Sequence, residues 1–334
     1  MTINVGINGM GRIGRMVIRA IIESQNKDIK IKHINNRSNS EASCSLIKYD
    51  SVHGKFNANL NYDENHLIIN KNKITFSQES KIEDINWKKF GVDYVFECTG
   101  KFNSKDKLEP HLRNGAKKVI VSAPCKNADK TIVYGVNHKS INKNDLVISA
   151  ASCTTNCLAP VANVLNDEFK IEKGFMTTIH SYTTDQRLLD NSHKDPRRAR
   201  SAGQSIVPTS TGASKALGEI IPELKGKLEG LAMRVPTPNV SLIDLVFISK
   251  NKLSVKKIND CFISASKKKL KNVLDATEER LVSIDFNHNP NSAIVDLSLT
   301  NVVGNNMGKV SAWYDNEWGF ACRMNDLAEY IHKI

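Results

Sequence analysis

The sequence is poor in aromatic residues and contains no long apolar run. Phenylalanine, tryptophan and tyrosine make up 6% of its 334 residues, and no apolar stretch approaches the length needed to cross a bilayer. No basic and then apolar leader precedes the first predicted strand, so a secretory signal is not expected. We therefore expect a cytoplasmic protein with no membrane partner.

The seven cysteines lack the spacing of a zinc site. Cys153 and Cys157 are four residues apart and the others are isolated, so no metal is predicted. An odd number in a long chain favours free thiols in a reducing compartment. Cys98 lies in an apolar strand and Cys157 lies one helical turn after Cys153, which favours buried structural roles for both.

Acidic residues are too few to balance the basic ones. Lysine and arginine number 47 against 35 aspartates and glutamates, which gives a net charge of +12. The lysines are scattered and are not interleaved with aromatic residues, so a nucleic-acid-binding protein is the weaker alternative. The short run Arg197–Arg200 is a candidate for binding a phosphate group.

A strand of alternating apolar residues runs directly into a glycine-rich turn near the N-terminus. Residues 3–7 form the strand, Gly9, Gly11 and Gly14 form a GxGxxG motif, and a helical pattern follows through residue 21. The first glycine permits a tight turn, the second lets the backbone approach a pyrophosphate, and the third packs helix against strand. This context predicts a dinucleotide-binding unit.

The end of the second predicted strand lacks the acid that usually binds the adenosine ribose. Strand 29–34 is followed by Asn35, Asn36, Arg37 and Ser38. An acid would repel a 2′-phosphate, whereas an amide and a guanidinium can bind one. The sequence therefore favours NADP, or at least tolerance of it. The alternative is that Asn36 binds the ribose of NAD and that Arg37 is simply solvated.

The organisation of the chain changes near residue 150. Before it, strands alternate with helices, as in a doubly wound sheet. After it, the strands are longer and few helices follow them; we expect strands at 174–181, 228–235, 241–249, 292–300 and 306–314 and a helix at 255–270. The predicted fold class is α/β, with an N-terminal Rossmann dinucleotide-binding domain (1–151 plus 316–334) and an α+β catalytic domain with a mixed or antiparallel sheet (152–315).

A candidate nucleophile stands where the two patterns meet. An apolar strand runs into Ser149–Pro160, and a helical pattern leaves it, so Cys153 is predicted at a helix N-terminus. Backbone N–H groups and the helix dipole at such a position lower the pKa of a thiol, and the thiolate attacks carbonyls. His180, at the end of a later strand, is a candidate base.

Three further elements have the character of phosphate sites. They are the long polar loop 185–205 with its arginines, the helix start at 208–213, and Arg234 at a strand end. Together with a thiolate, a histidine and a nucleotide-binding unit, they indicate hydride transfer from a small phosphorylated aldehyde.

These motifs together resemble the phosphorylating glyceraldehyde-3-phosphate dehydrogenase family over essentially the whole chain. The matching stretches are Asn4–Gly14, Tyr49–Gly54, Ser149–Pro160, His180–Thr183, Pro208–Lys215, Met233–Val240 and Trp313–Gly319. The resemblance implies that Cys153 is the nucleophile and His180 the base. It implies a homotetramer in which loop 185–205 reaches a neighbouring subunit's cofactor. The substrates would be D-glyceraldehyde 3-phosphate and inorganic phosphate; erythrose 4-phosphate is the alternative aldehyde.

The resemblance also implies the binding residues. The attacking phosphate would be bound by Ser152, Thr154, Thr211 and Gly212, and the substrate phosphate by Thr183, Asp185, Arg197 and Arg234. The cofactor would be lined by Gly9, Arg12, Ile13, Lys81, Ser122 and Asn316.

Two departures from the family pattern concern the cofactor. NAD-specific members usually have Asp where Asn36 stands, and Leu-Pro where this chain has Asn191 and Ser192. Ser192 resembles the serine of photosynthetic, NADP-using members. NAD or NADP is therefore the expected cofactor, with NADP accepted or preferred.

Overall fold

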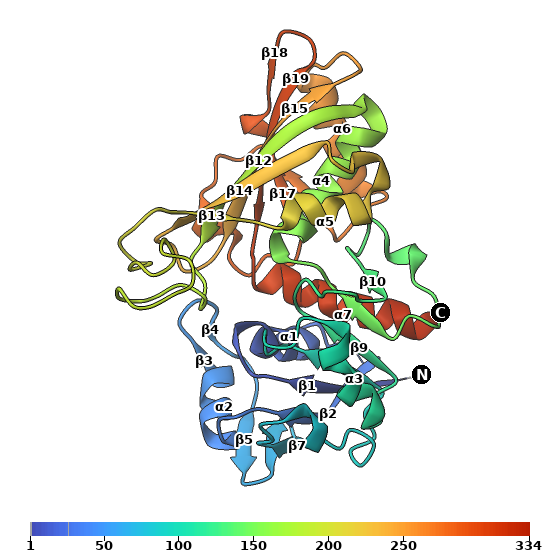
Figure 1. The fold of residues 1–334 in the computed structure, drawn as a ribbon, viewed down its shortest axis with the longest axis vertical. Helices are drawn as coiled ribbons and strands as arrows, with labels where there is room; N and C mark the ends of the chain where they lie inside the picture. Colours follow the sequence, from blue (N-terminus) through green and yellow to red (C-terminus); the bar gives the residue numbers. More distant parts are fainter. Residues whose placement is uncertain (1, 26) are drawn as a thin grey trace. The chain divides into compact units, whose positions relative to one another are not determined.

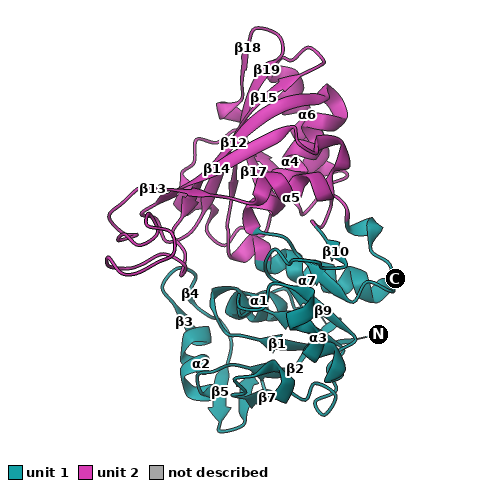
Figure 2. Ribbon diagram, in the orientation of Figure 1, with its two compact units in different colours: residues 1–132, 138–152, 321–334 teal, residues 133–137, 153–320 magenta. Residues whose placement is uncertain are grey.

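The computed structural model describes residues 2–25 and 27–334 (Figure 1). The chain divides into two compact units (Figure 2): unit 1 comprises residues 1–132, 138–152 and 321–334, and unit 2 comprises residues 133–137 and 153–320. Among the described residues, no helix has both the length and the apolar character that a membrane span requires. These units are defined by contacts alone. The domain boundaries expected from the sequence therefore remain a prediction.

Unit 1 is built on a nine-stranded sheet with the strand order β10-β11-β9-β8-β1-β2-β7-β6-β5. Its seven parallel strands are β1 (Ile3–Asn8), β2 (Ile29–Asn35), β7 (Asn72–Ser77), β8 (Tyr94–Glu97), β9 (Lys118–Val121), β10 (Lys130–Thr131) and β11 (Val147–Ser149). Its helical elements are α1 (Arg12–Glu23), α2 (Ser40–Lys48), α3 (Lys105–Arg113), η1 (Ile82–Asp84), η2 (His138–Ser140) and most of α7 (Trp318–Lys333). The central strands β1, β8 and β9 are mostly buried, as expected for parallel strands covered on both faces.

The predicted alternation of strands and helices is wrong at one edge of this sheet. Residues 67–69 and 73–76 lie in β6 (His66–Ile69) and β7, which pair antiparallel, and β5 (Leu60–Asp63) extends the edge. Asn70 and Lys71 have φ of 49° and 69°, the geometry of a two-residue hairpin turn. A tight turn replaces the helix that a parallel crossover would need. A separate short hairpin pairs β3 (Tyr49–Asp50) with β4 (Gly54–Lys55).

Unit 2 contains an eight-stranded mixed sheet, which confirms the predicted architecture. The strand order is β13-β14-β12-β15-β19-β17-β16, and β18 pairs with β19. The strands are β12 (Ile171–Ser181), β13 (Val207–Ser210), β14 (Leu228–Val235), β15 (Ser241–Ser249), β16 (Leu274–Thr277), β17 (Ala293–Asp296), β18 (Asn301–Val303) and β19 (Met307–Tyr314). The helical elements are α4 (Cys153–Phe169), α5 (Ala213–Ile220), α6 (Val255–Lys267), η3 (Pro222–Leu224), η4 (Ser283–Phe286) and η5 (Leu297–Leu299).

The central strands of unit 2 explain how its functional residues come together. β12 pairs parallel with β14 and antiparallel with β15, and buried residues alternate with half-buried ones along β15. α4 packs against β12, β15, β17 and β19. The predicted strand 292–300 is shorter than expected because Asp296 Oδ1 accepts a hydrogen bond from Ser298 N and starts a 3-10 turn.

Candidate active site

The candidate nucleophile is the first residue of α4, as predicted. Ala151, two residues earlier, has φ of 59° and its N–H donates to Ser149 Oγ at 3.1 Å. A left-handed φ is strained for a residue with a Cβ and is held only where the surroundings enforce it. The strained turn therefore takes the chain abruptly from the end of β11 into the helix that starts at Cys153.

The structure brings the candidate base to the nucleophile within unit 2. His180 Nε2 lies 3.5 Å from Cys153 Sγ, and the histidine is 3% exposed near the end of β12. The parallel register of β12 and β14 pairs His180 with Arg234. Arg234 Nη1 lies 2.6 Å from His180 Nδ1 and donates to the Ser181 carbonyl at 2.9 Å.

The electrostatics of this pair differ from the prediction. Burial raises the pKa of the Cys153 thiol, and it outweighs the Arg234 charge and the hydrogen bonds from Thr154 that lower it. The expectation of a lowered pKa for this thiol is therefore wrong. Burial, followed by the charge of Arg234, lowers the pKa of His180 to about 3, so its imidazole is neutral near pH 7.

A buried hydroxyl network supports the turn after Cys153. Tyr314 OH lies 2.9 Å from Thr154 Oγ1 and 2.9 Å from Thr178 Oγ1. The Tyr314 ring also meets His180 edge-on, with centroids 5.9 Å apart. Sequence reasoning missed Tyr314, because a tyrosine in a buried strand has no signal that distinguishes it from core.

Asn316 is held by two serine hydroxyls. Ser181 Oγ and Ser241 Oγ each donate to Asn316 Oδ1 at 2.9 Å. Val240, next to Ser241, has φ of 65°, a strained conformation for a β-branched residue. Because both serines occupy the amide oxygen, the orientation of the Asn316 side chain is fixed, with its NH2 group directed away from them.

Three of the four substrate-phosphate candidates lie on the loop after β12, and the arginine that pairs with Asp185 there is not the predicted one. Arg198, not the predicted Arg197, forms an ion pair with Asp185 and donates to Thr209 Oγ1 at 2.8 Å. Arg197 is exposed, and its backbone N–H donates to Asp195 Oδ1. Thr183 N donates to Gln186 Oε1 at 3.4 Å, which closes the turn at the start of the loop.

The predicted attacking-phosphate residues lie at two helix starts. Thr154 lies in the first turn of α4, and Ser152 is the residue immediately before that helix. Thr211 Oγ1 accepts a hydrogen bond from Ala213 N at 3.2 Å, and Gly212 is the N-cap of α5. A Cβ on Gly212 would meet nothing within 4 Å, so the backbone there is open on that side.

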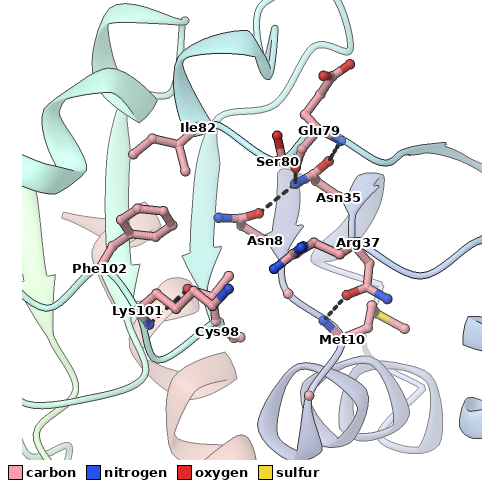
Figure 3. A pocket seen from close by; sticks show the side chains of 14 residues that line it. Asn8, Met10, Asn35, Arg37, Glu79, Ser80, Ile82, Cys98, Lys101 and Phe102 are labelled. Carbon is pink, nitrogen blue, oxygen red and sulfur yellow. Dashed lines mark hydrogen bonds between the residues drawn. The ribbon is translucent and has the colours of Figure 1, made fainter.

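A separate cavity in unit 1 contains part of the predicted cofactor set (Figure 3). Gly9, Gly11, Asn36 and Arg37 line it. Asn36 Oδ1 accepts from Met10 N at 3.3 Å and Asn36 Nδ2 donates to Ser43 Oγ at 3.1 Å. The cavity therefore joins the glycine turn to the end of β2, as the motif predicts.

The remaining cofactor candidates do not line this cavity. Ser80 lines it instead of Lys81, which is the N-cap of η1. Arg12 pairs bidentately with Asp50, with Nη2 to Oδ1 at 3.0 Å. The other candidates outside it are Ile13, Gly14 and Ser122 in unit 1 and Ser192 and Asn316 in unit 2.

Asn8 and Asn35 line the same cavity and were not predicted. Asn35 Nδ2 donates to Asn8 Oδ1 at 2.9 Å, and Asn8 Nδ2 donates to Glu97 Oε2 at 2.7 Å. Asn35 Oδ1 accepts from Glu79 N at 2.9 Å, which fixes the loop that follows β7. Asn8 ends β1 and Asn35 ends β2, and these positions at strand ends were the signal in the sequence that could have identified them as cavity residues. No cluster of potential metal ligands occurs among residues 2–25 and 27–334.

Comparisons with known proteins match the whole chain. Residues 3–105 match the family model of the glyceraldehyde 3-phosphate dehydrogenase NAD binding domain, and residues 152–316 match that of the C-terminal domain. Glyceraldehyde-3-phosphate dehydrogenase of Xanthobacter flavus is 51% identical over 334 residues, covering all of both chains. Glyceraldehyde-3-phosphate dehydrogenase 2 of Bacillus subtilis (strain 168) is 49% identical over 333 residues, covering 99% of this chain and 97% of the relative. The chain belongs to the glyceraldehyde-3-phosphate dehydrogenase family.

Proposed function

We propose that the protein oxidises D-glyceraldehyde 3-phosphate to 1,3-bisphosphoglycerate, reversibly, with inorganic phosphate and NAD or NADP. The observation that carries the proposal is the contact of 3.5 Å between Cys153 Sγ and His180 Nε2 beside Arg234. A thiol, a base and a cation in one buried site are the groups that acyl transfer through sulfur requires.

The chemistry begins at Cys153. Cys153 gives its proton to His180 Nε2, and the thiolate adds to the aldehyde carbon as the same proton passes to the carbonyl oxygen, which gives a thiohemiacetal on sulfur. His180 Nε2 takes the proton of the new hydroxyl group as the carbon is oxidised. The bound dinucleotide supplies the hydride acceptor. Inorganic phosphate then attacks the resulting thioester, and the acyl phosphate leaves as the Cys153 thiolate is restored.

The phosphate groups are assigned to two sets of residues. The substrate phosphate is assigned to Arg198, Asp185 and Thr183. The ion pair between Arg198 and Asp185 orients the guanidinium that would bind this phosphate. Thr154, Thr211 and Gly212 at two helix starts serve the attacking phosphate. Arg234 serves both, because its strand register places it beside His180.

The test of this assignment replaces one cysteine at a time. Cys153→Ser should lower turnover by on the order of 10⁴-fold or more, while dinucleotide binding is retained. Cys157→Ser is the matched control, because Cys157 lies one turn further along α4 with its Sγ 3.8 Å from the Ala312 carbonyl, buried in the core. Substantial turnover by Cys153→Ser would refute the assignment.

The aldehyde is identified by kinetics with two sugar phosphates. Turnover with glyceraldehyde 3-phosphate should exceed turnover with erythrose 4-phosphate, the alternative substrate. A higher kcat/KM for erythrose 4-phosphate would make that sugar phosphate the substrate, while the chemistry proposed at Cys153 would stay the same.

We infer that NADP is accepted alongside NAD. Asn36 and Arg37 line the cavity at the end of β2, where an acid would discriminate against a 2′-phosphate. Figure 3 shows the carboxylate of Glu79, which lines the same cavity, directed away from Arg37. Ser192 supports the inference through the family resemblance alone.

The cofactor proposal is tested by the ratio of kcat/KM for NADP and NAD. Asn36→Asp should shift this ratio towards NAD by roughly 10-fold to 100-fold, because a carboxylate repels the 2′-phosphate. A strong NAD preference in the wild type would contradict the proposal.

The proposed assembly is a homotetramer. Leu188 and Leu189 are 83% and 72% exposed on the loop after β12, and Ile206 is 68% exposed beside β13. Large apolar side chains with this exposure are typical of surfaces covered by a partner. Light scattering should give four chains per particle for the wild type, and a smaller particle for Leu188→Asp. A monomeric wild type would contradict the proposal.

A further inference from the structure

Three neighbouring strands of unit 1 end on buried polar residues that lie side by side. β1 ends at Asn8, β2 at Asn35 and β8 at Glu97, and the strand registers pair Asn8 with both of the others. Asn8 and Asn35 line the cavity of unit 1, and Figure 3 shows the hydrogen bond between them. Glu97 is not among the lining residues. It therefore contacts the wall of the cavity without facing the cavity itself.

Four donors converge on the Glu97 carboxylate. Oε2 accepts from Asn8 Nδ2 at 2.7 Å and lies 3.1 Å from His111 Nε2. Oε1 accepts from Thr99 N at 2.8 Å and also from the Thr99 hydroxyl. Trp87 Nε1–H can only donate, and it bonds His111 Nδ1 at 2.9 Å, so the proton of His111 is on Nε2 and points at Glu97. Both oxygens of Glu97 therefore have to accept, which a carboxylate does and an amide does not.

The same polarity continues along the strand ends. Asn8 donates to Glu97, and its Oδ1 accepts from Asn35 Nδ2 at 2.9 Å. Asn35 Oδ1 accepts in turn from Glu79 N at 2.9 Å and from Ser77 Oγ at 2.8 Å. The bonds at both ends of this chain require the same orientation of the two amide groups. Neither amide can turn over without setting a buried N–H group against another N–H group.

Glu97 also fixes a second part of the cavity wall. Thr99 lines the cavity, donates its hydroxyl to Glu97 and accepts from Lys101 N at 3.2 Å. A Cβ on Gly9 would lie 2.9 Å from Thr99 N, so the turn after β8 packs closely against the glycine turn. A displacement of Thr99 would therefore change the wall beside the glycine turn.

We propose that Glu97 is a positioning residue for the dinucleotide: its carboxylate holds Asn8 and Thr99 in the arrangement that receives the adenosine end of the cofactor. The proposal rests on the proposed function, in which a dinucleotide occupies this cavity. A wall that is already ordered lowers the free energy that is lost to ordering when the ligand binds. Glu97 thus tightens dinucleotide binding without contacting the dinucleotide.

The sign of the effect distinguishes positioning from simple charge. Glu97 directly precedes Cys98 and Thr99, which both line the cavity, so its negative charge lies near a site for an anionic ligand. A like charge weakens the binding of an anion. If charge alone mattered, removing it would tighten dinucleotide binding, whereas the loss of positioning weakens it.

The test is the Kd of NAD, and separately of NADP, for Glu97→Gln, measured by calorimetry on the full chain without substrate. The glutamine has nearly the same shape, but its NH2 group must face either Asn8 and His111 or the two donors of Thr99. We expect each dinucleotide to bind roughly 10-fold to 100-fold more weakly. The KM for the dinucleotide should rise with its Kd, while kcat at saturation stays within about 2-fold of the wild-type value.

Asp93→Ala is the matched control, because Asp93 joins β1 to the start of β8 at the other end of the same strands. Its Oδ2 accepts from Asn4 N at 3.1 Å, and it does not line the cavity. Urea unfolding should show a loss of stability for this variant, whereas its dinucleotide Kd should equal that of the wild type. A purely structural role of Glu97 would make the two variants behave alike.

A second variant decides the proposal if Glu97→Gln does not fold. His111→Leu removes one donor from Glu97, and His111 does not line the cavity. Each dinucleotide should then bind roughly 3-fold to 10-fold more weakly.

Four results would overturn the proposal. They are unchanged or tighter dinucleotide binding by folded Glu97→Gln, a fall in its kcat with KM unchanged, an equal weakening in Asp93→Ala, and wild-type binding by His111→Leu where Glu97→Gln does not fold. A wild type that binds neither NAD nor NADP would refute the proposed function, and this proposal with it. Failure of the positioning role alone is therefore distinguishable from failure of the proposed function.

Discussion

A buried histidine should make unit 1 sensitive to acid. His33 lies in β2 and is 0% exposed. Its Nδ1 is 2.8 Å from Thr75 Oγ1 and its Nε2 is 2.8 Å from Ser77 Oγ, and its ring stacks on Phe90 at 3.7 Å. Both ring nitrogens are engaged by hydroxyl groups, and no carboxylate is among these neighbours, so a protonated ring has no countercharge in contact with it.

The size of the effect follows from the pKa. Burial lowers the pKa of His33 from 6.5 to about 4. Between these values the unfolded chain binds a proton that the folded chain does not, so the free energy of unfolding falls as the pH falls through this window. The full difference is about 3 kcal/mol at about 1.4 kcal/mol per pH unit, and about 2 kcal/mol of it is lost by about pH 5.

The assay is urea unfolding of the wild type and of His33→Gln near pH 7 and pH 5. Fluorescence of Trp87, whose ring lies 5.5 Å from that of His33, contributes to the signal. The variant should be less stable near pH 7 but should lose about 2 kcal/mol less than the wild type on acidification. His66→Gln, on the partly exposed hairpin strand β6, is the control. Equal losses in the wild type and His33→Gln would refute the argument.

Three further predictions concern both units. Gly14→Ala drives a Cβ into the Gly9 carbonyl oxygen, so urea unfolding should show a loss of about 1–3 kcal/mol, and unchanged stability would contradict the close approach. Asp50→Asn leaves the Arg12 guanidinium without its carboxylate, and calorimetry near pH 7 should show a loss of about 2–3 kcal/mol, with no loss if the pair is dispensable. Arg198→Leu should raise KM for glyceraldehyde 3-phosphate by roughly 10-fold to 100-fold with the dinucleotide Kd unchanged; an unchanged KM would remove Arg198 from the substrate site.

The sequence was sufficient for the elements that bear chemistry, because each has a local signal. The pattern of a helix start predicted the position of Cys153, and the pattern of a strand end predicted the position of His180. Their contact across 27 residues depends on the packing of α4 against β12, and the position of Arg234 beside His180 depends on the register of β12 with β14. That register is set by packing over the whole sheet, and no spacing along the chain encodes it.

Two features of the site could not be predicted from the sequence: which arginine of the irregular loop pairs with Asp185, and how burial changes the pKa of Cys153. The loop after β12 has no periodicity, so the sequence could not show that Arg198 rather than Arg197 turns towards Asp185. A helix start is visible in the sequence but the burial of the thiol is not. The expected direction of the Cys153 pKa was therefore wrong, since burial outweighs the charge of Arg234 and the hydrogen bonds from Thr154.

Cofactor preference remains separable from folding because of how Asn36 is bonded. Its Oδ1 accepts from Met10 N and its Nδ2 donates to Ser43 Oγ. An aspartate would keep the first bond, and the Ser43 hydroxyl can rotate to donate to the second carboxylate oxygen. Asn36→Asp thus exchanges a neutral side chain for a charged one while both contacts persist. A change in the ratio of NADP to NAD efficiency would then report the charge that faces the ribose rather than damage to the end of β2.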